Sequence, residues 1–208
     1  MFLITNRNLC DKERYYKVIS ESCRGGVDNI IVREKDLPEG ELMDLFKRIN
    51  FEIPEDIRKK INLIVNSSIS VYEMTICDGI HLPFHLFKEQ VNKSYKFNPK
   101  KLIGLSLHSI EDIKEMNDIC AENDIKVDYI TLSHIFETKC KEGLKPKGIE
   151  LLKNSIGLTN AKRVALGGIS LENAAEVLKY CDDFAVMSAI MKSDDGKAMA
   201  ENFVSKEK

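Results

Sequence analysis

The sequence predicts an α/β protein folded as one TIM (β/α)8 barrel over residues 1–208. Short runs rich in Ile, Val and Leu recur along the whole chain with little polar alternation, as in parallel strands covered on both faces. Most runs are followed by a stretch with helical periodicity. Eight runs in 208 residues leave 26 residues for each strand–helix unit (208/8), which is enough for a small barrel.

A doubly wound open sheet is the competing architecture, because strand count alone separates it poorly from a barrel. No Gly- or Pro-rich linker divides the chain, so we expect a single domain. The expected strands are Phe2–Thr5, Asn29–Arg33, Leu63–Asn66, Gly79–Leu82, Leu102–Ser106, Tyr129–Ser133, Arg163–Gly167 and Phe184–Ser188.

Two of the expected helices carry clear signals. Apolar side chains recur at helical spacing on one side of Ile110–Cys120, and a second helix is expected to begin with Ser170 as its N-cap. The segment Ser133–Pro146 is the longest polar stretch after a strand. A loop of that length in a compact chain usually acts as a lid or a binding loop.

Composition excludes several classes of protein. Lysine plus arginine number 31 and aspartate plus glutamate 33, so the net charge of −2 argues against a dedicated nucleic-acid binder. No run of ~18 apolar residues exists to cross a membrane. The N-terminal apolar run lacks the basic region of a signal peptide, so we expect a cytoplasmic protein. The six cysteines form no CxxC pair, which favours free thiols over a zinc site.

The residues after each strand are the candidates for chemistry, because barrels and open α/β sheets both bind ligands at the carboxyl ends of their strands. These residues are cationic, amide, hydroxyl, imidazole or glycine and include few carboxylates. They suit an anionic, phosphate-bearing ligand. They are Arg33, Lys35, Asn66, Ser67, Ser106, His108, Ser133, His134, Gly167, Gly168 and Ser188.

The prediction that the protein binds a phosphate group depends on two segments. Gly167-Gly168 lets backbone N–H groups approach a ligand, and Ser188 begins what we expect to be the last helix, whose N-terminus favours an anion. The alternative is that the glycines form only a tight turn. Arg33 and Lys35 would point the same way if the chain stays extended, and could then bind an anion. Their alternative is a pair of solvated surface charges.

Histidine is the side chain best suited to exchange protons near neutral pH. His81 lies within a predicted strand and is expected to have a structural role, and His85 is expected to be exposed at a helix start. His108 and His134 follow strands and are the candidates for acid/base catalysis. The motifs GxSxG, GxxxxGK[ST] and GxGxxG are absent, so neither hydrolase chemistry nor nucleotide binding is indicated.

Short segments spread over almost the whole chain resemble the thiamine phosphate synthase/TenI family, and they occur in the family's order. The resemblance implies a TIM barrel. The segments are Leu3-Ile-Thr-Asn, Val32-Arg-Glu-Lys, Leu63-Ile-Val-Asn, Asp78-Gly-Ile-His-Leu, Ile103-Gly-Leu-Ser-Leu-His-Ser, Asp128-Tyr-Ile-Thr-Leu-Ser-His-Ile-Phe-Glu-Thr, Ala165-Leu-Gly-Gly-Ile and Ala185-Val-Met-Ser-Ala-Ile.

The family has two activities, and this chain departs from the synthase pattern. Ile31 replaces a glutamine, Ser67 replaces an aspartate, and Pro83–Leu86 replaces a Gly-Gln-x-Asp run. The two lost aspartates are the family's magnesium ligands, and magnesium needs carboxylate or phosphate oxygens. The segment from His134 to Leu144 closely resembles the thiazole tautomerases of the family, as does the Ser-x-His motif at Ser106 and His108.

The resemblance therefore implies a thiazole tautomerase that isomerises a carboxythiazole phosphate without a cofactor, with His108 as the acid/base. The alternatives are a thiamine phosphate synthase, which would need magnesium, and a non-catalytic thiazole-phosphate-binding regulator. A homodimer is the expected assembly to test. The implied substrate-binding residues are Arg33, Lys35, Asn66, Ser106, His134, Thr138, Lys141, Gly167, Gly168, Met187 and Ser188.

Overall fold

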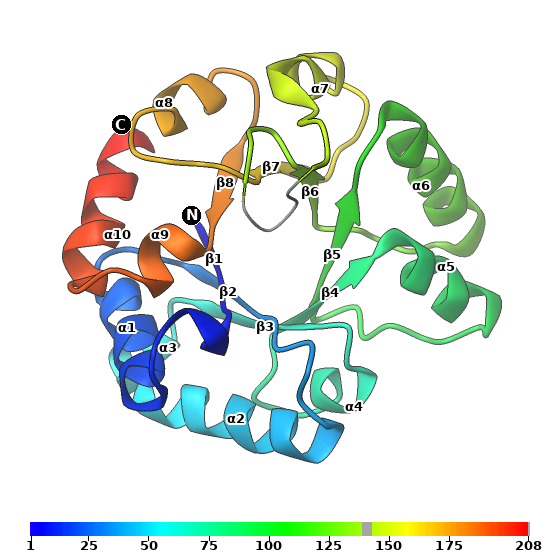
Figure 1. Cartoon of the computed structure of the whole chain (residues 1–208). Helices are drawn as coiled ribbons and strands as arrows, with labels where there is room; N and C mark the ends of the chain where they lie inside the picture. The colour runs from blue at the N-terminus through cyan, green and yellow to red at the C-terminus, as the bar shows by residue number, and fades with distance from the viewer. Residues whose placement is uncertain (139–142, 208) are drawn as a thin grey trace. The chain divides into compact units, whose positions relative to one another are not determined.

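Eight parallel strands close into a barrel in sequence order, so the predicted TIM barrel is confirmed and the open sheet is excluded. The computed structural model describes residues 1–138 and 143–207. Each strand lies within two residues of its predicted bounds. The strands are β1 Phe2–Ile4, β2 Asn29–Val32, β3 Asn62–Asn66, β4 Gly79–Pro83, β5 Leu102–Leu107, β6 Tyr129–Ser133, β7 Lys162–Leu166 and β8 Asp183–Val186 (Figure 1).

The chain divides into two compact units, Met1–Ile80 with Val186–Lys208, and His81–Ala185. The expectation of one domain over residues 1–208 stays a prediction. The first unit holds η1 Arg7–Leu9, α1 Lys12–Arg24, α2 Glu39–Glu52, α3 Glu55–Arg58, α4 Ile69–Tyr72, α9 Ser188–Met191, α10 Gly196–Val204 and η3 Ser205–Glu207. The second holds α5 Phe84–Asn92, α6 Ile110–Asn123, α7 Gly148–Asn154 and α8 Ala174–Val177.

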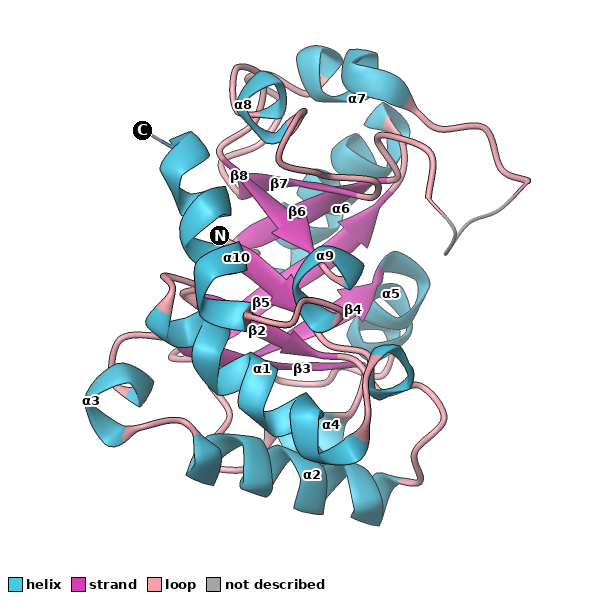
Figure 2. Cartoon of the chain, turned by 60° about the vertical axis from the view of Figure 1, so that its left-hand side comes forward, coloured by secondary structure: helices cyan, strands magenta, loops and turns pink. Residues whose placement is uncertain are grey.

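In the first unit, α1 and α10 lie side by side (Figure 2). Both helices bury apolar side chains, among them Val18 and Ile19 of α1 and Ala200 and Phe203 of α10. Removing this apolar area from water is the main contribution of the pair to stability. Within the described residues, no helix is both long enough and apolar enough to span a membrane.

In the second unit, α6 begins at its predicted residue because of a capping box. The Ser109 hydroxyl accepts from the Asp112 amide, and the Asp112 carboxylate accepts from the Ser109 amide. The predicted start of α8 at Ser170 is wrong. Instead the Asn173 side chain accepts from the Ser170 amide and donates to the Gly168 carbonyl, which holds a turn, and the helix begins only at Ala174.

An aspartate directly precedes each even-numbered strand, and all four make the same pair of hydrogen bonds. Asp78 accepts from the Leu63 amide through its carboxylate and donates its own amide to the Leu63 carbonyl. Asp128 does the same to Ile103. Because the first N–H groups of a strand have no partner within it, each carboxylate closes the amino end of a strand pair. The other two pairs are Asp28 with Met1 and Asp182 with Arg163.

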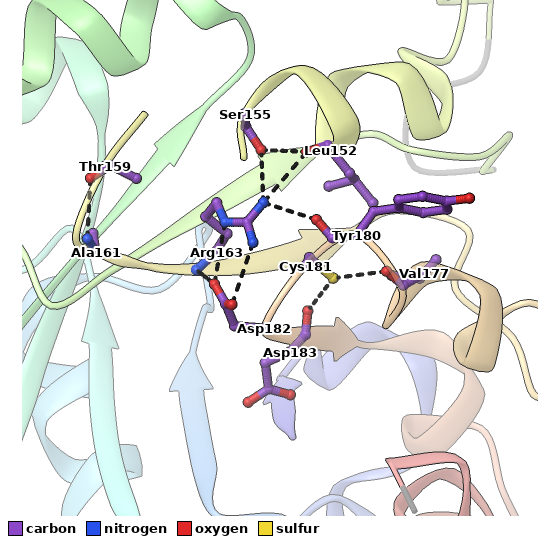
Figure 3. Close-up of polar contacts among 10 residues, drawn as sticks. All are labelled: Leu152, Ser155, Thr159, Ala161, Arg163, Val177, Tyr180, Cys181, Asp182 and Asp183. Carbon is purple, nitrogen blue, oxygen red and sulfur yellow. Dashed lines mark hydrogen bonds and ion pairs between the residues drawn. The ribbon is translucent and has the colours of Figure 1, made fainter. Parts of the chain in front are cut away.

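Arg163 joins three segments at the amino end of β7 (Figure 3). Its guanidinium donates to the Tyr180 carbonyl at 2.9 Å and lies 3.3 Å from the Asp182 carboxylate. It also contacts Ser155 Oγ and the Leu152 carbonyl, where α7 ends. With only 13% of its side chain exposed, Arg163 satisfies carbonyl groups that would otherwise be buried without partners.

Candidate active site

The predicted site residues follow strands in both units. Arg33, Lys35, Asn66, Met187 and Ser188 belong to the first unit, and Ser106, His108, His134, Thr138, Gly167 and Gly168 to the second. Lys141 lies outside the described residues.

His108 is held at both its backbone and its ring. Its amide donates to Asp112 Oδ2 at 2.7 Å, so the capping residue of α6 also fixes the exit from β5. Its ring Nδ1 lies 2.9 Å from the Ser133 carbonyl oxygen and 3.2 Å from Ser133 Oγ. A carbonyl oxygen can only accept, so Nδ1 carries the hydrogen of the neutral ring. Nε2 of His108 then has the lone pair of a general base, and the side chain is exposed.

Below His108 on β5, Ser106 contacts two side chains from neighbouring strands. His81 Nε2 lies 2.7 Å from Ser106 Oγ, and the Thr131 hydroxyl donates to the same oxygen at 3.4 Å. His81 Nδ1 lies 3.2 Å from the Tyr129 hydroxyl. The structural role expected for His81 is confirmed, since it is buried and hydrogen-bonded. His85 is exposed near the start of α5, as expected.

His134 ties the base of the long loop after β6. Its Nε2 lies 3.2 Å from the Leu144 carbonyl, and its own carbonyl accepts from the Lys147 amide. Its ring therefore makes the structural contact that is the alternative to a proton role. Over the described residues, 134–138 and 143–147 form neither helix nor strand, which agrees with the predicted loop. Thr138 is half-buried within it.

The Gly-Gly pair lies against this loop. A Cβ at Gly167 would come within 2.4 Å of His134 Cβ, and one at Gly168 within 2.5 Å of the Glu137 carbonyl oxygen. Both glycines have positive φ. The loop continues along β7 through hydrogen bonds from the Ile135 amide to Leu166 and from the Phe136 amide to Gly167. Close packing therefore requires glycine here, and phosphate binding by the pair stays a prediction.

In the first unit, a buried carboxylate holds the exit from β2. Glu34 accepts hydrogen bonds from the hydroxyls of Thr5 and Tyr15 and from the Arg7 amide, at 2.6 to 2.9 Å. The Thr5 hydroxyl also accepts from the Arg33 amide. Burial raises the pKa of Tyr15 well above its usual value, and the charge of Glu34 adds to that rise. The sequence argument did not identify this network.

The two cations after β2 are not on an extended segment. The strand ends at Val32, and a turn closed by the Leu37 amide and the Glu34 carbonyl follows. Lys35 lies in that turn and is exposed, while Arg33 is half-buried. The extended segment on which the alignment of the two side chains depended therefore does not continue through Lys35, and their joint binding of an anion stays a prediction. Within the described residues, neither side chain has a carboxylate partner.

The loop after β3 does not suit magnesium. Asn66 donates from its amide to Ser67 Oγ at 2.8 Å, so this segment offers an amide and a hydroxyl bonded to each other. Ser67 has a φ of 67°, a left-handed conformation that aspartate and asparagine tolerate better than serine. Within residues 1–138 and 143–207, no three His, Cys, Asp or Glu side chains cluster as metal ligands. The donor set does not fit a magnesium ion, which prefers carboxylate oxygens.

Ser188 does begin a helix, but the expectation that this is the last helix is wrong. It starts the four-residue α9, and α10 follows. So short a helix has few aligned peptide dipoles, which weakens the anion argument at Ser188 and Met187. A surface cavity of about 490 Å³ in the second unit is lined by Ile103 and Asp128, among others, at the amino ends of β5 and β6. It therefore lies at the opposite ends of these strands from His108.

The fold and the residues at the strand ends define a TIM-barrel protein with an imidazole and hydroxyl groups at the carboxyl ends of its strands. A family model described as thiamine monophosphate synthase matches residues 1–190. The chain belongs to this family of thiamine-biosynthesis enzymes, as the sequence resemblance predicted.

Named relatives are similar over nearly their full lengths. The thiamine-phosphate synthase of Persephonella marina is 30% identical, with 97% of this chain and 92% of the relative covered. That of Methanobrevibacter smithii is 30% identical, with 98% and 93% covered. The solved thiamine phosphate pyrophosphorylase of Pyrococcus furiosus superposes with a TM-score of 0.78 at 25% identity, with 99% and 93% covered.

Proposed function

We propose that this member of the family is a thiazole tautomerase, which isomerises a carboxythiazole phosphate to its aromatic tautomer. The observation that carries the proposal is the contact between His108 Nδ1 and the Ser133 carbonyl. It leaves Nε2 of an exposed imidazole as an oriented base at the carboxyl end of β5. A base of this kind, close to a ring carbon, is what a proton shift requires.

One imidazole can both remove and return the proton, so the proton shift needs no second catalytic group. Nε2 of His108 takes a proton from one ring atom of the substrate and becomes N–H, and the same N–H then returns a proton to a second ring atom. The gain of aromaticity drives the reaction, so neither a metal nor a redox cofactor is required. Positioned acid/base catalysis of this type contributes typically ~10²–10⁴-fold.

The remaining predicted residues bind the substrate in this proposal. Backbone amides of Gly167 and Gly168 in the second unit, or those of Met187 and Ser188 in the first, would hold the phosphate. Arg33 or Lys35, which have no carboxylate partner within the described residues, would meet the carboxylate of the substrate. The Ser106 hydroxyl would donate to an anionic oxygen. Asn66, His134 and Thr138 are further candidates for polar contacts with the substrate, as is Lys141, which lies outside the described residues.

The second candidate is a thiamine phosphate synthase, and the names of the relatives favour it. That reaction joins a pyrimidine pyrophosphate to thiazole phosphate and releases pyrophosphate. The residues of this chain argue against it, because Ser67 and Pro83–Leu86 supply no carboxylate where the synthase pattern has its magnesium ligands. Substrate phosphates alone would then have to hold the ion.

Two reactions with the same preparation decide between these candidates. The first contains the carboxythiazole phosphate and EDTA, and the isomer ratio is followed by NMR. The second contains hydroxymethylpyrimidine pyrophosphate, thiazole phosphate and Mg²⁺, and pyrophosphate release is measured. We expect isomerisation in the first. Pyrophosphate release without isomerisation would establish the synthase, and tight thiazole phosphate binding without either reaction would indicate a binding protein.

A further inference from the structure

The strands β5 and β6 share a polar face that extends from the buried part of the sheet to His108. Gly104 pairs with Tyr129 and Ser106 with Thr131 in the parallel register, and alternate residues of a strand point to the same side. The opposite face of β5 is apolar and buried at Leu105 and Leu107. Ser106 therefore lies between the buried Tyr129 level and the exposed His108 level of one polar face.

His81 of β4 contacts two residues of this face, Ser106 and Tyr129. Its Nε2 contacts Ser106 Oγ at 2.7 Å, and its Nδ1 contacts the Tyr129 hydroxyl at 3.2 Å. Its ring also stacks on the Tyr129 ring at a centroid distance of 5.6 Å. Because His81 is only 3% exposed, its orientation is set by packing as well as by these hydrogen bonds.

The contacts of His81 with Tyr129 and Ser106 indicate which ring nitrogen carries the hydrogen toward Ser106. A phenol is a better donor than acceptor, so Tyr129 donates to Nδ1 and the ring hydrogen is on Nε2. Nε2–H then donates to Ser106 Oγ, to which Thr131 also donates. With both lone pairs of Ser106 occupied, its own hydrogen is directed away from these partners.

A proton relay through His81 is less favourable than a fixed hydrogen bond. A relay that draws on Tyr129 would require His81 to recover a proton from the phenol after it passes one outward through Ser106. Burial raises the pKa of the Tyr129 phenol well above its ordinary value, and Asp128 adds to the rise, so the phenolate is not accessible near neutral pH. The His81–Tyr129 pair therefore orients Ser106 without supplying protons.

We propose that His81 is a positioning residue that holds Ser106 Oγ through Nε2, so that the Ser106 hydroxyl is presented as a donor to an anionic oxygen of thiazole phosphate. This inference deepens the proposed function and rests on its assignment of thiazole phosphate as a ligand. It does not depend on which of the two reactions follows, because both use that ligand.

Two substitutions of His81 separate positioning from packing. In His81→Gln the side-chain amide reaches the position of Nε2 and can still donate to Ser106. In His81→Asn the shorter amide matches Nδ1 and keeps only the Tyr129 side. The dissociation constant for thiazole phosphate is measured by calorimetry. We expect a roughly tenfold weaker binding in His81→Asn and in Ser106→Ala, and a change within about twofold in His81→Gln.

The double variant His81→Asn/Ser106→Ala tests the coupling. We expect it to bind no more weakly than Ser106→Ala alone, because His81 acts only through that hydroxyl. If the two substitutions weaken thiazole phosphate binding by factors that multiply in the double variant, the inference is overturned. Wild-type affinity in His81→Asn, or no binding of thiazole phosphate by the wild-type protein, would overturn it as well. In His81→Asn, KM should rise for whichever reaction the protein catalyses, while kcat and its pH profile stay nearly unchanged.

Thermal unfolding of each variant controls for loss of the fold. If His81→Asn does not fold, Tyr129→Phe removes the partner that fixes the tautomer of His81 and leaves the imidazole in place. We then expect binding weakened about two- to fivefold, an effect that Ser106→Ala abolishes. Unchanged affinity in Tyr129→Phe would count against the proposal. If the effects of the His81 and Ser106 substitutions on binding are coupled but the protein does not isomerise the carboxythiazole phosphate, the tautomerase assignment is overturned and this inference stands.

Discussion

The Nδ1 atom of His108 lies 2.9 Å from the Ser133 carbonyl oxygen, and this contact determines which ring nitrogen keeps a lone pair. In His108→Asn, the amide nitrogen can keep the contact to Ser133 while the base at Nε2 is lost. We expect the isomerisation rate to fall by about 10²–10⁴-fold, with thiazole phosphate affinity within about threefold of wild type. Progress curves and calorimetry measure the two quantities. Wild-type turnover in this variant would remove His108 from the mechanism.

Gly168 and Gly157 form a matched pair for testing the loop contact. Both have a φ near 70°, but a Cβ at Gly168 would meet the Glu137 carbonyl oxygen at 2.5 Å, and nothing lies within 4 Å at Gly157. We expect Gly157→Ala to destabilise the fold by ~1–2 kcal/mol from its backbone conformation alone. Gly168→Ala should cost a further ~1–3 kcal/mol from overpacking. Urea unfolding measures both, and equal losses would contradict the steric argument.

Arg163 is expected to contribute more to stability than exposed cations do. Arg163→Leu leaves the Tyr180 carbonyl without its donor and removes the contact to Asp182. We expect a loss of about 2–4 kcal/mol in the free energy of unfolding. Lys47→Leu breaks only the exposed pair with Asp44 and should stay within about 0.5 kcal/mol of wild type. A small effect at Arg163 would show that its hydrogen bonds are replaced by water.

Asp124 places both a positive φ and a negative charge at the C-terminus of α6. Its φ is 53°, and the helix dipole disfavours an anion at this end. We expect Asp124→Gly to raise the free energy of unfolding by ~1 kcal/mol. Asp124→Asn removes only the charge and should give ~0.3–0.5 kcal/mol. Denaturant midpoints check both values. A larger gain in the free energy of unfolding for Asp124→Asn than for Asp124→Gly would contradict the contribution assigned to the positive φ.

Stability at high pH should depend on Cys23 of α1. Burial raises the pKa of the Cys23 thiol from 9.0 to about 12. The unfolded chain therefore loses this proton at a lower pH than the folded protein, and the stabilisation present below pH 9 is lost as the pH rises toward 12. We expect the advantage of wild type over Cys23→Ala to shrink by up to ~1.4 kcal/mol per pH unit in that window. If the free energies of unfolding of wild type and Cys23→Ala change with pH in parallel between pH 9 and 12, this prediction is contradicted.

The eight strands could be predicted because each is a short apolar run whose backbone must be covered on both faces. The start of α6 could be predicted because Ser109 and Asp112 form a capping box within four residues. These are local signals. The start of α8 was placed too early because its apolar spacing resembles that of a longer helix, whereas the Asn173 side chain bonds to the turn before it. Competition from a side chain for backbone groups is not visible in periodicity.

The candidate site was predicted in residue type more than in role. The position of His108 after β5 followed from the strand pattern, but the identity of its basic nitrogen depends on Ser133 of another strand. The sequence pattern around Arg33 and Lys35 did not reveal the Glu34 network between them, because its partners Thr5 and Tyr15 lie far away in sequence. The sequence predicted that the Gly167-Gly168 pair binds phosphate, and the contact of this pair with the loop after β6 became visible only in the structure.

The amino-acid sequence by itself determined the barrel, the family and the set of polar residues at the strand ends, because hydrophobic runs and short motifs are properties of neighbouring residues. Only the tertiary structure decided which hydrogen each of these groups carries and what it touches. The hydrogen bonds of His81, Ser106 and His108 join different strands, and a partner some 25 residues away in sequence is chosen by strand register.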